Sequence, residues 1–289
     1  IAIEGAKLFN LPAPTQGAAS LMILALVNKL KKDFQNESDW IHLIVEATKR
    51  AFILRNKSIT DPSFTAQIYE SMTSSQFIID EADKISMLSA LEWPYSSRES
   101  DTVWVGAIDA QGTLVSFIQS IYWEFGSGIA IPELGFVWNN RGSSFSLEKE
   151  NINHLRPSAK PFHTLNPAMA IFDDGRRLAY GCMGGEGQPQ TQAAIFSRYA
   201  WLSESLDNAV SRGRWLLGRT WGEESHSLKI EADLYDEVKN SLLNLGHDIV
   251  CVPKHSEMMG HAGAILNTSS GDSVAVTDPR SDGAAIVID

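Results

Sequence analysis

The chain has 289 residues, of which 44% are hydrophobic and 20% are charged, a composition typical of a soluble globular protein. Thirty-five acidic against 24 basic residues give a formal net charge of −11, which disfavours binding to nucleic acid or to an anionic membrane surface. The two cysteines, Cys182 and Cys251, indicate no disulfide framework, so a reducing compartment such as the cytoplasm is favoured.

Helices are predicted for most of the first 100 residues. The apolar run 18–30 predicts a buried helix, because a membrane span needs about 20 apolar residues and this run is shorter. Apolar residues recur at helical spacing over 40–54, and Asp39 is the expected N-cap of this second helix. A third helical stretch is expected over 63–90. The chain opens without Met or a signal-peptide pattern, so we expect further sequence upstream.

After residue 100 the pattern changes to that of strands. Segments 102–109 and 113–122 are rich in β-branched and aromatic residues and flank a short loop, 110–112, which predicts a hairpin. Helices are also expected after Gly187 and near 206–215 and 235–245, and strands near 178–181, 227–231, 248–252, 262–267 and 273–277. Helices followed by mixed elements indicate an α+β protein whose sheets pack between helical layers.

The loop of the hairpin predicts the register of its strands. A three-residue loop ending in glycine is best built as a type I turn followed by a left-handed residue, and Gly112 suits that position. Counting outward from the loop places Thr102 opposite Ser120. Directly opposed side chains share one face of a sheet, so the two hydroxyls are expected to be neighbours.

Thr102 is the candidate nucleophile. A threonine hydroxyl attacks poorly unless a base takes its proton, and a free α-amine on the same residue is one such base. This chemistry requires cleavage between Asp101 and Thr102, which would separate residues 1–101 from residues 102–289 where the sequence pattern changes. The competing interpretation is an ordinary strand threonine.

An oxyanion site is the second element that this chemistry needs. Gly184 and Gly185 lie between a predicted strand and a predicted helix, and their backbone N–H groups could stabilise a developing oxyanion. A glycine pair also marks any tight turn, so the pair alone does not establish the site.

Several motifs, in order, resemble the gamma-glutamyltransferase family of N-terminal-nucleophile hydrolases. They cover nearly the whole chain, at 12–17, 42–52, 102–109, 125–128, 139–140, 160–167, 183–187 and 278–284. The resemblance implies a four-layer αββα fold and self-cleavage before Thr102, whose acyl-enzyme is resolved by water or an amine. It also implies that residues 1–101 end a large subunit whose N-terminal part lies upstream, and that 102–289 form the small subunit.

By the same resemblance, Thr102 matches the nucleophile, Ser120 the hydroxyl beside it, and Gly184 and Gly185 the oxyanion donors. The substrate pocket departs from the family: Arg141 replaces an acidic or amide side chain that faces the substrate ammonium. The implied substrate-binding positions are Asn140, Arg141, Ser144, His163, Thr164 and Tyr122, with His163 and Thr164 in place of paired serines and Tyr122 in place of an asparagine.

Arg141 determines the substrate class that we expect. A guanidinium is permanently cationic and its fork suits a carboxylate, so it would repel an ammonium and attract an acid. The motifs also resemble the branch of the family that contains oxamate amidohydrolase and cephalosporin acylase-like relatives. A small acidic amide is therefore the expected substrate, with a gamma-glutamyl compound as the alternative. For Arg141 alone, the alternative is a solvated loop arginine. For the whole chain, the alternative of another class is an unprocessed, catalytically silent binding domain.

No cofactor or metal is expected, because the seven histidines show no HxxxH spacing and no close Cys/His pair. Cys182, beside the glycine pair, is expected to be a small buried residue rather than a nucleophile. Self-association into a homo-oligomer is left open.

Overall fold

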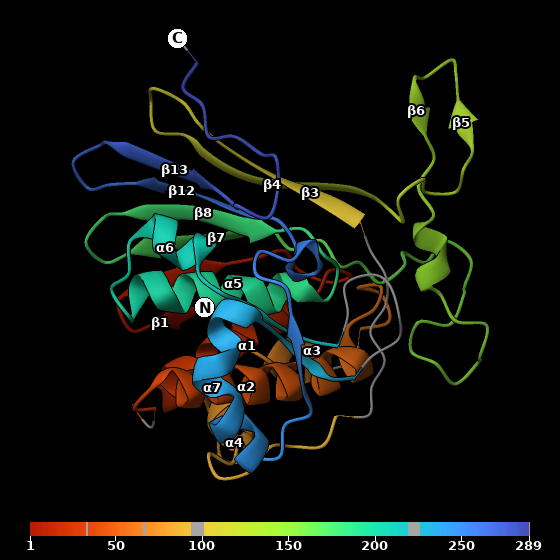
Figure 1. Cartoon of the computed structure of the whole chain (residues 1–289). Coiled ribbons are helices and arrows are strands. Elements are labelled where there is room, and N and C mark those ends of the chain that lie inside the picture. The colour runs from red at the N-terminus through yellow and green to blue at the C-terminus, as the bar shows by residue number, and fades with distance from the viewer. Residues whose placement is uncertain (33, 66–67, 94–100, 219–225, 289) are drawn as a thin grey trace.

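The computed structural model describes residues 1–32, 34–65, 68–93, 101–218 and 226–288. Its main sheet has six antiparallel strands in the order β1-β2-β7-β8-β12-β13 (Figure 1). These strands are β1 (Ala2–Ile3), β2 (Ala6–Phe9), β7 (Ala168–Phe172), β8 (Arg177–Cys182), β12 (Ala262–Asn267) and β13 (Ser273–Thr277).

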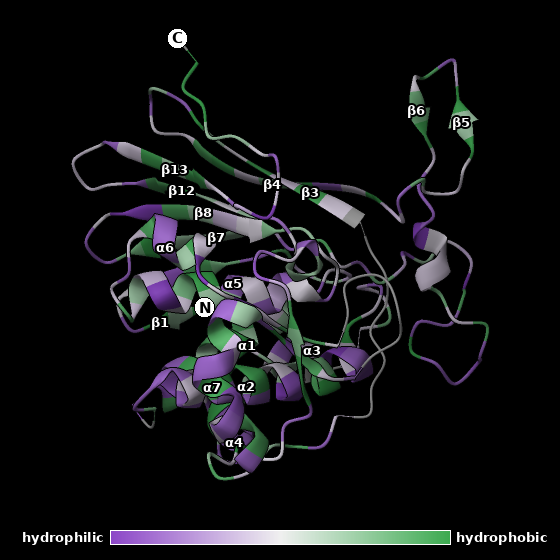
Figure 2. Ribbon diagram, in the orientation of Figure 1, coloured by the Kyte–Doolittle hydropathy of each residue, from purple (hydrophilic) through white to green (hydrophobic). Residues whose placement is uncertain are grey.

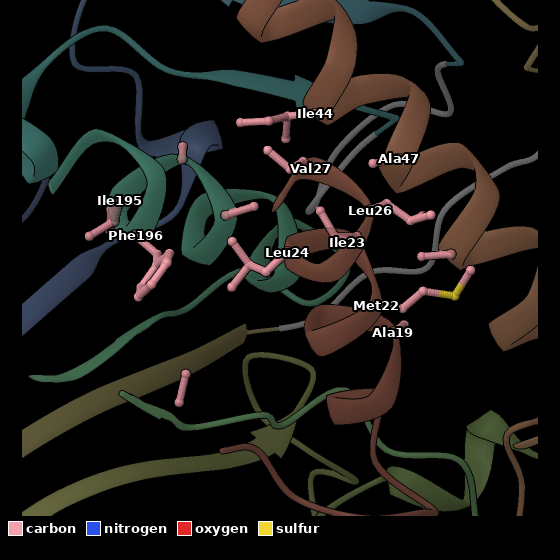
Figure 3. Close-up of a cluster of buried hydrophobic side chains, with 14 of the residues drawn as sticks. Ala19, Met22, Ile23, Leu24, Leu26, Val27, Ile44, Ala47, Ile195 and Phe196 are labelled. Carbon is pink, nitrogen blue, oxygen red and sulfur yellow. The ribbon is translucent and has the colours of Figure 1, made fainter. Parts of the chain in front are cut away.

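Helices cover one face of this sheet. The apolar run becomes α1 (Gly17–Leu30), which packs between α2 (Glu37–Ser58) and α5 (Gly187–Ala200) and is buried on nearly all sides. Figure 3 shows side chains of α1 among those of α2 and α5. Because α1 meets apolar neighbours all round, its sequence lacks the polar stripe of a surface helix. None of the helices in the described ranges is long and apolar enough to cross a membrane.

The predicted hairpin, β3 (Asp101–Ile108) and β4 (Leu114–Tyr122), lies on the other face of the main sheet (Figure 1). Trp104 fills the space between the two layers: a Cβ added at Gly181 would lie 2.1 Å from its ring, and one at Gly263 would lie 2.4 Å from it. The glycines thus let the layers approach. The α+β class is confirmed. The described residues form three of the four expected layers, α, β and β, and the second helical layer is not among them.

Smaller elements complete the chain. A three-stranded sheet and two helices follow α5, namely α6 (Leu206–Ser211), β9 (Trp215–Leu217), β10 (Leu228–Glu231), α7 (Ala232–Asn244) and β11 (Ile249–Val252). The two-stranded arm of β5 (Ala130–Ile131) and β6 (Phe136–Val137) extends from the body in Figure 1 and is mostly apolar in Figure 2.

Three local predictions were wrong. The N-cap of α2 is Asn36, whose side chain accepts a hydrogen bond from the Asp39 N–H. The stretch 63–90 is not one helix, because its described residues form two short helices, α3 (Ile68–Ser71) and α4 (Ser75–Ala82). Ser74 is the N-cap of the second helix, and its side chain accepts a hydrogen bond from the Phe77 N–H. The helix expected over 206–215 ends at Ser211. Trp215, the last residue of the predicted helix, lies instead in the buried strand β9.

Candidate active site

The end of the β3–β4 hairpin positions Thr102. Gly112 has φ +82° and the strands pair as predicted as far as Val103 opposite Gln119. The register then shifts, because Asp101 pairs with Tyr122 and leaves Thr102 opposite both Ser120 and Ile121. This is a β-bulge, a feature that bends a strand and re-aims its side chains. The predicted one-to-one pairing of Thr102 with Ser120 is therefore corrected to a bulge.

Ser120 and Tyr122 fix the geometry of that bulge. The Ser120 Oγ accepts a hydrogen bond from the Tyr122 N–H at 2.8 Å. Tyr122 has φ +83°, a left-handed conformation that costs free energy in a residue with a Cβ. Its backbone is held in this state by the hydrogen bond and by pairing with Asp101, so the strand end next to the buried Thr102 is rigidly specified.

Arg141 is a buried cation above the Tyr122 ring. It begins the 3-10 turn η1 (Arg141–Ser144), and its N–H donates to the Asn139 side chain at 2.9 Å. The guanidinium carbon lies 3.9 Å from the Tyr122 ring centroid, a cation–π contact, and Nη1 donates to Thr164 Oγ1 at 3.2 Å. Burial lowers the pKa of Arg141 to about 10. Among the described residues, Nη2 has no hydrogen-bond partner and no carboxylate pairs with the side chain.

A pocket of about 350 Å³ opens beside this guanidinium. It is lined by Pro14, Ser120, Asn139, Arg141, Lys160, Pro161 and His163. Two of these side chains are cations and none is a carboxylate, which favours an anionic ligand. Thr102, Gly184 and Gly185 do not line it. Lys160 was not among the predicted site residues, although it precedes His163 in the same motif.

His163 presents a neutral imidazole to the pocket. Its Nδ1 accepts a hydrogen bond from the Leu165 N–H at 3.4 Å, which places the ring hydrogen on Nε2. Burial, and secondarily Arg141, lowers the pKa of His163 to about 4. The ring is therefore uncharged at neutral pH and can donate a hydrogen bond, while acid–base chemistry near pH 7 is disfavoured.

The other predicted substrate-binding residues support the pocket instead of lining it. Thr164 is buried and accepts a hydrogen bond from the Arg141 side chain, and the ring of Tyr122 stacks against the same guanidinium. Asn140 accepts from the Trp123 N–H at 3.1 Å and so fixes the chain after β4. Ser144 is fully buried at the end of η1.

The glycine pair forms a turn that only glycine adopts easily. Gly184 and Gly185 have φ +107° and +51°. The Gly184 carbonyl accepts from the Gly187 N–H at 2.8 Å, at the start of α5. In a trans peptide the C=O and N–H point in opposite directions, so the Gly185 N–H points away from the helix. Within the described ranges neither glycine N–H has an acceptor, which leaves both able to donate to an oxyanion.

Comparisons with known proteins identify the family. The family model of gamma-glutamyltranspeptidase matches residues 1–288. The chain belongs to this family. Oxamate amidohydrolase proenzyme of Klebsiella pneumoniae is 49% identical over 96% of this chain and 53% of its own length. The glutathione hydrolase-like YwrD proenzyme of Bacillus subtilis is 37% identical over 99% of this chain and 54% of that protein.

Among solved structures, cephalosporin acylase from Bacillus halodurans matches 98% of this chain and 51% of its own, with 27% identity and a TM-score of 0.85. This likeness confirms the fold expected for the gamma-glutamyltranspeptidase family. The chain spans about half the length of the relatives it matches.

Cys182 lies directly before the glycine turn of this family member. It is fully buried, and burial, the largest of several effects, raises the pKa of its thiol to about 11. A thiol with a raised pKa stays protonated at neutral pH and is a poor nucleophile. The prediction of a small buried residue is confirmed.

Away from the pocket, a cluster with two histidines lies in the helical layer, and the sequence did not predict it. Ligand atoms of His42, Glu46 and His247 lie within 4.8 Å of one another. His42 and Glu46 share a helix face at i,i+4, but His247 follows α7 and only the fold brings it near. The imidazoles hydrogen-bond each other at 2.7 Å, and the Lys49 ammonium pairs with Glu46 at 2.7 Å, so a cation already occupies the cluster.

We expect the free energy of unfolding to decrease as pH falls from about 6.5 toward 4. Burial lowers the pKa of His163 to about 4 and that of His247 to about 3, from 6.5. In this range the unfolded chain binds more protons than the folded chain, so acid favours unfolding. Chemical denaturation at several pH values would measure the loss. His247→Gln should reduce it and the exposed-site control His226→Gln should not; equal slopes in both variants would contradict the assignment.

Proposed function

We propose that this chain carries the catalytic residues of a self-processing N-terminal threonine amidohydrolase that acts on a small acidic amide. The observation that carries the proposal is the buried Arg141, whose Nη2 has no partner among the described residues and which lines the pocket with Lys160 and His163. An unpaired buried cation is costly, and a substrate carboxylate would supply its counter-charge. Oxamate, a carboxylate bonded directly to an amide, has this chemistry.

The proposed mechanism begins with cleavage between Asp101 and Thr102. The freed α-amine of Thr102 takes the proton of its own hydroxyl, and the oxygen attacks the amide carbon. The resulting oxyanion accepts hydrogen bonds from Gly184 and Gly185, while Ser120 orients the nucleophile. The protonated amine gives its proton to the leaving nitrogen, ammonia departs, and an ester on Thr102 remains. Water, deprotonated by the same amine, then releases the acid and regenerates Thr102.

The proposed subunits follow from that cleavage. Residues 1–101 would end the large subunit and residues 102–289 would form the small one, so that a single composite domain survives processing. The matched relatives are named proenzymes and are about twice as long as this chain. We therefore propose a further part of the large subunit as the partner of this chain. The apolar outer face of the hairpin, with Val103, Val105, Val115 and Phe117 exposed, supports such a covering layer.

A gamma-glutamyl hydrolase is the second candidate, because one relative is named glutathione hydrolase-like. Turnover of oxamate by the full-length protein should exceed that of a gamma-glutamyl anilide by about 100-fold or more in kcat/KM, since Arg141 repels the α-ammonium of the glutamyl group. Ammonia release and anilide absorbance measure the two reactions. A preference for the anilide would favour the second candidate.

A further inference from the structure

One buried glutamine joins the anion-binding loop to the glycine turn. Gln16 precedes α1 and is fully buried. Its Nε2 donates to two backbone carbonyls, that of Thr164 at 2.7 Å and that of Gly185 at 2.8 Å. A carboxamide NH₂ has two hydrogens in a fixed plane, so this one group sets the spacing of the two carbonyls.

Each of the two carbonyls belongs to a residue that serves the proposed chemistry. Thr164 holds the Arg141 guanidinium through its hydroxyl at 3.2 Å. The Gly185 carbonyl belongs to the turn that presents the oxyanion donors. The Gln16 side chain therefore connects the group that would bind the substrate carboxylate to the groups that would bind the oxyanion.

The amide of Gln16 is itself held in place. Its Oε1 accepts from Arg55 Nη1 at 3.0 Å, and Arg55 Nη2 donates to Glu186 at 3.1 Å. The Arg55 guanidinium also lies 3.9 Å from the centroid of the Phe52 ring. The bond to Arg55 fixes which end of the amide faces the two carbonyls, so the orientation of the NH₂ group is specified by α2.

We propose that Gln16 is a positioning residue that sets the distance between Arg141 and the oxyanion donors. It thereby selects substrates by the number of atoms between their carboxylate and their scissile carbonyl. This inference rests on the proposed function. When a carboxylate is anchored, a shift of about 1 Å at the reacting carbon costs about 100-fold in rate, so a fixed spacing favours one chain length strongly.

The test compares oxamate, malonamate and succinamate, which differ by one methylene each, as substrates of the full-length protein. Wild type should prefer one of the three clearly. Gln16→Met keeps the side-chain volume and loses the hydrogen bonds of the carboxamide to Thr164, Gly185 and Arg55. It should lower kcat for the preferred amide at least ten-fold while changing KM less. The ratio of kcat/KM between the preferred amide and its neighbour should also fall at least ten-fold. Gln16→Glu, which keeps the acceptor for Arg55, should lose the same selectivity.

The control is Asn267→Leu, which removes a buried amide at the far end of β12, bonded to Arg177 and the backbone of 271–272. It should lower the melting temperature without changing the ratio between amides. Equal losses on all three amides in both Gln16 variants would show a structural role and overturn the proposal. If wild type hydrolyses gamma-glutamyl anilide and none of the three acids, the proposed function is wrong and the role of Gln16 falls with it.

Discussion

Thr102→Ala should leave the full-length protein as a single uncut chain and lower amide turnover by about 10⁴-fold or more. Alanine has no hydroxyl, so it can neither attack the preceding carbonyl nor form the acyl-enzyme. Thr102 is buried in the bulge opposite Ser120 and Ile121, where the pairing of Asp101 with Tyr122 fixes the strand end. Denaturing electrophoresis with mass spectrometry would show whether fragments divided after Asp101 appear, and ammonia release would measure turnover.

Two further variants separate the hydroxyl from the fold of the hairpin. Thr102→Ser keeps a hydroxyl beside the α-amine, so it should still divide and retain measurable activity. Thr113→Ala removes an exposed hydroxyl at the loop end of the same hairpin and should behave as wild type. Division of Thr102→Ala at the same bond would defeat the mechanism. An undivided wild-type protein without turnover would instead favour a catalytically silent binding domain.

The contrast between what the sequence predicted and what it missed has a physical basis in the hairpin. Gly112 and the alternation of the strands are local signals, and they gave the register correctly as far as Val103. The bulge at Thr102 is not local, because it depends on how Tyr122 is held at the strand end beneath Arg141. Sequence spacing alone therefore predicted that Thr102 lies across from Ser120, but it did not predict the bulge between them.

The site shows the same division. Arg141 and His163 were predicted from motifs and line the pocket, whereas the motifs gave no way to separate lining residues from supporting ones such as Thr164. Gln16 lies 148 positions from Thr164, and nothing in its own segment signals the contact. Such long-range side-chain bonds to the backbone form only when the layers pack, so they are absent from sequence periodicity.

Arg141→Met should weaken kcat/KM for oxamate by about 100-fold or more, mostly through KM. A carboxylate bound by the guanidinium is bound in both the ground state and the transition state, and loss of such uniform binding raises KM. Removing one partner of a buried charged pair typically costs about 2–5 kcal/mol. Arg141→Lys keeps the charge but loses the fork and the stacked plane on Tyr122, so it should recover only part of the loss. Initial rates over a range of oxamate concentrations would separate KM from kcat.

The same substitution should make the protein without substrate more stable, because the described residues give Arg141 no carboxylate to neutralise its buried charge. An uncompensated buried ion costs several kcal/mol in lost hydration, a cost that an apolar side chain of similar size avoids. Arg177→Met, which removes an arginine bonded to Asn267 at the far end of the sheet, should lower stability. Oxalate, the product anion, should raise the melting temperature of wild type and of the Arg177 variant but leave that of Arg141→Met unchanged. A lower melting temperature for Arg141→Met, with the response to oxalate intact, would show that this arginine braces the loop and that the anion binds elsewhere.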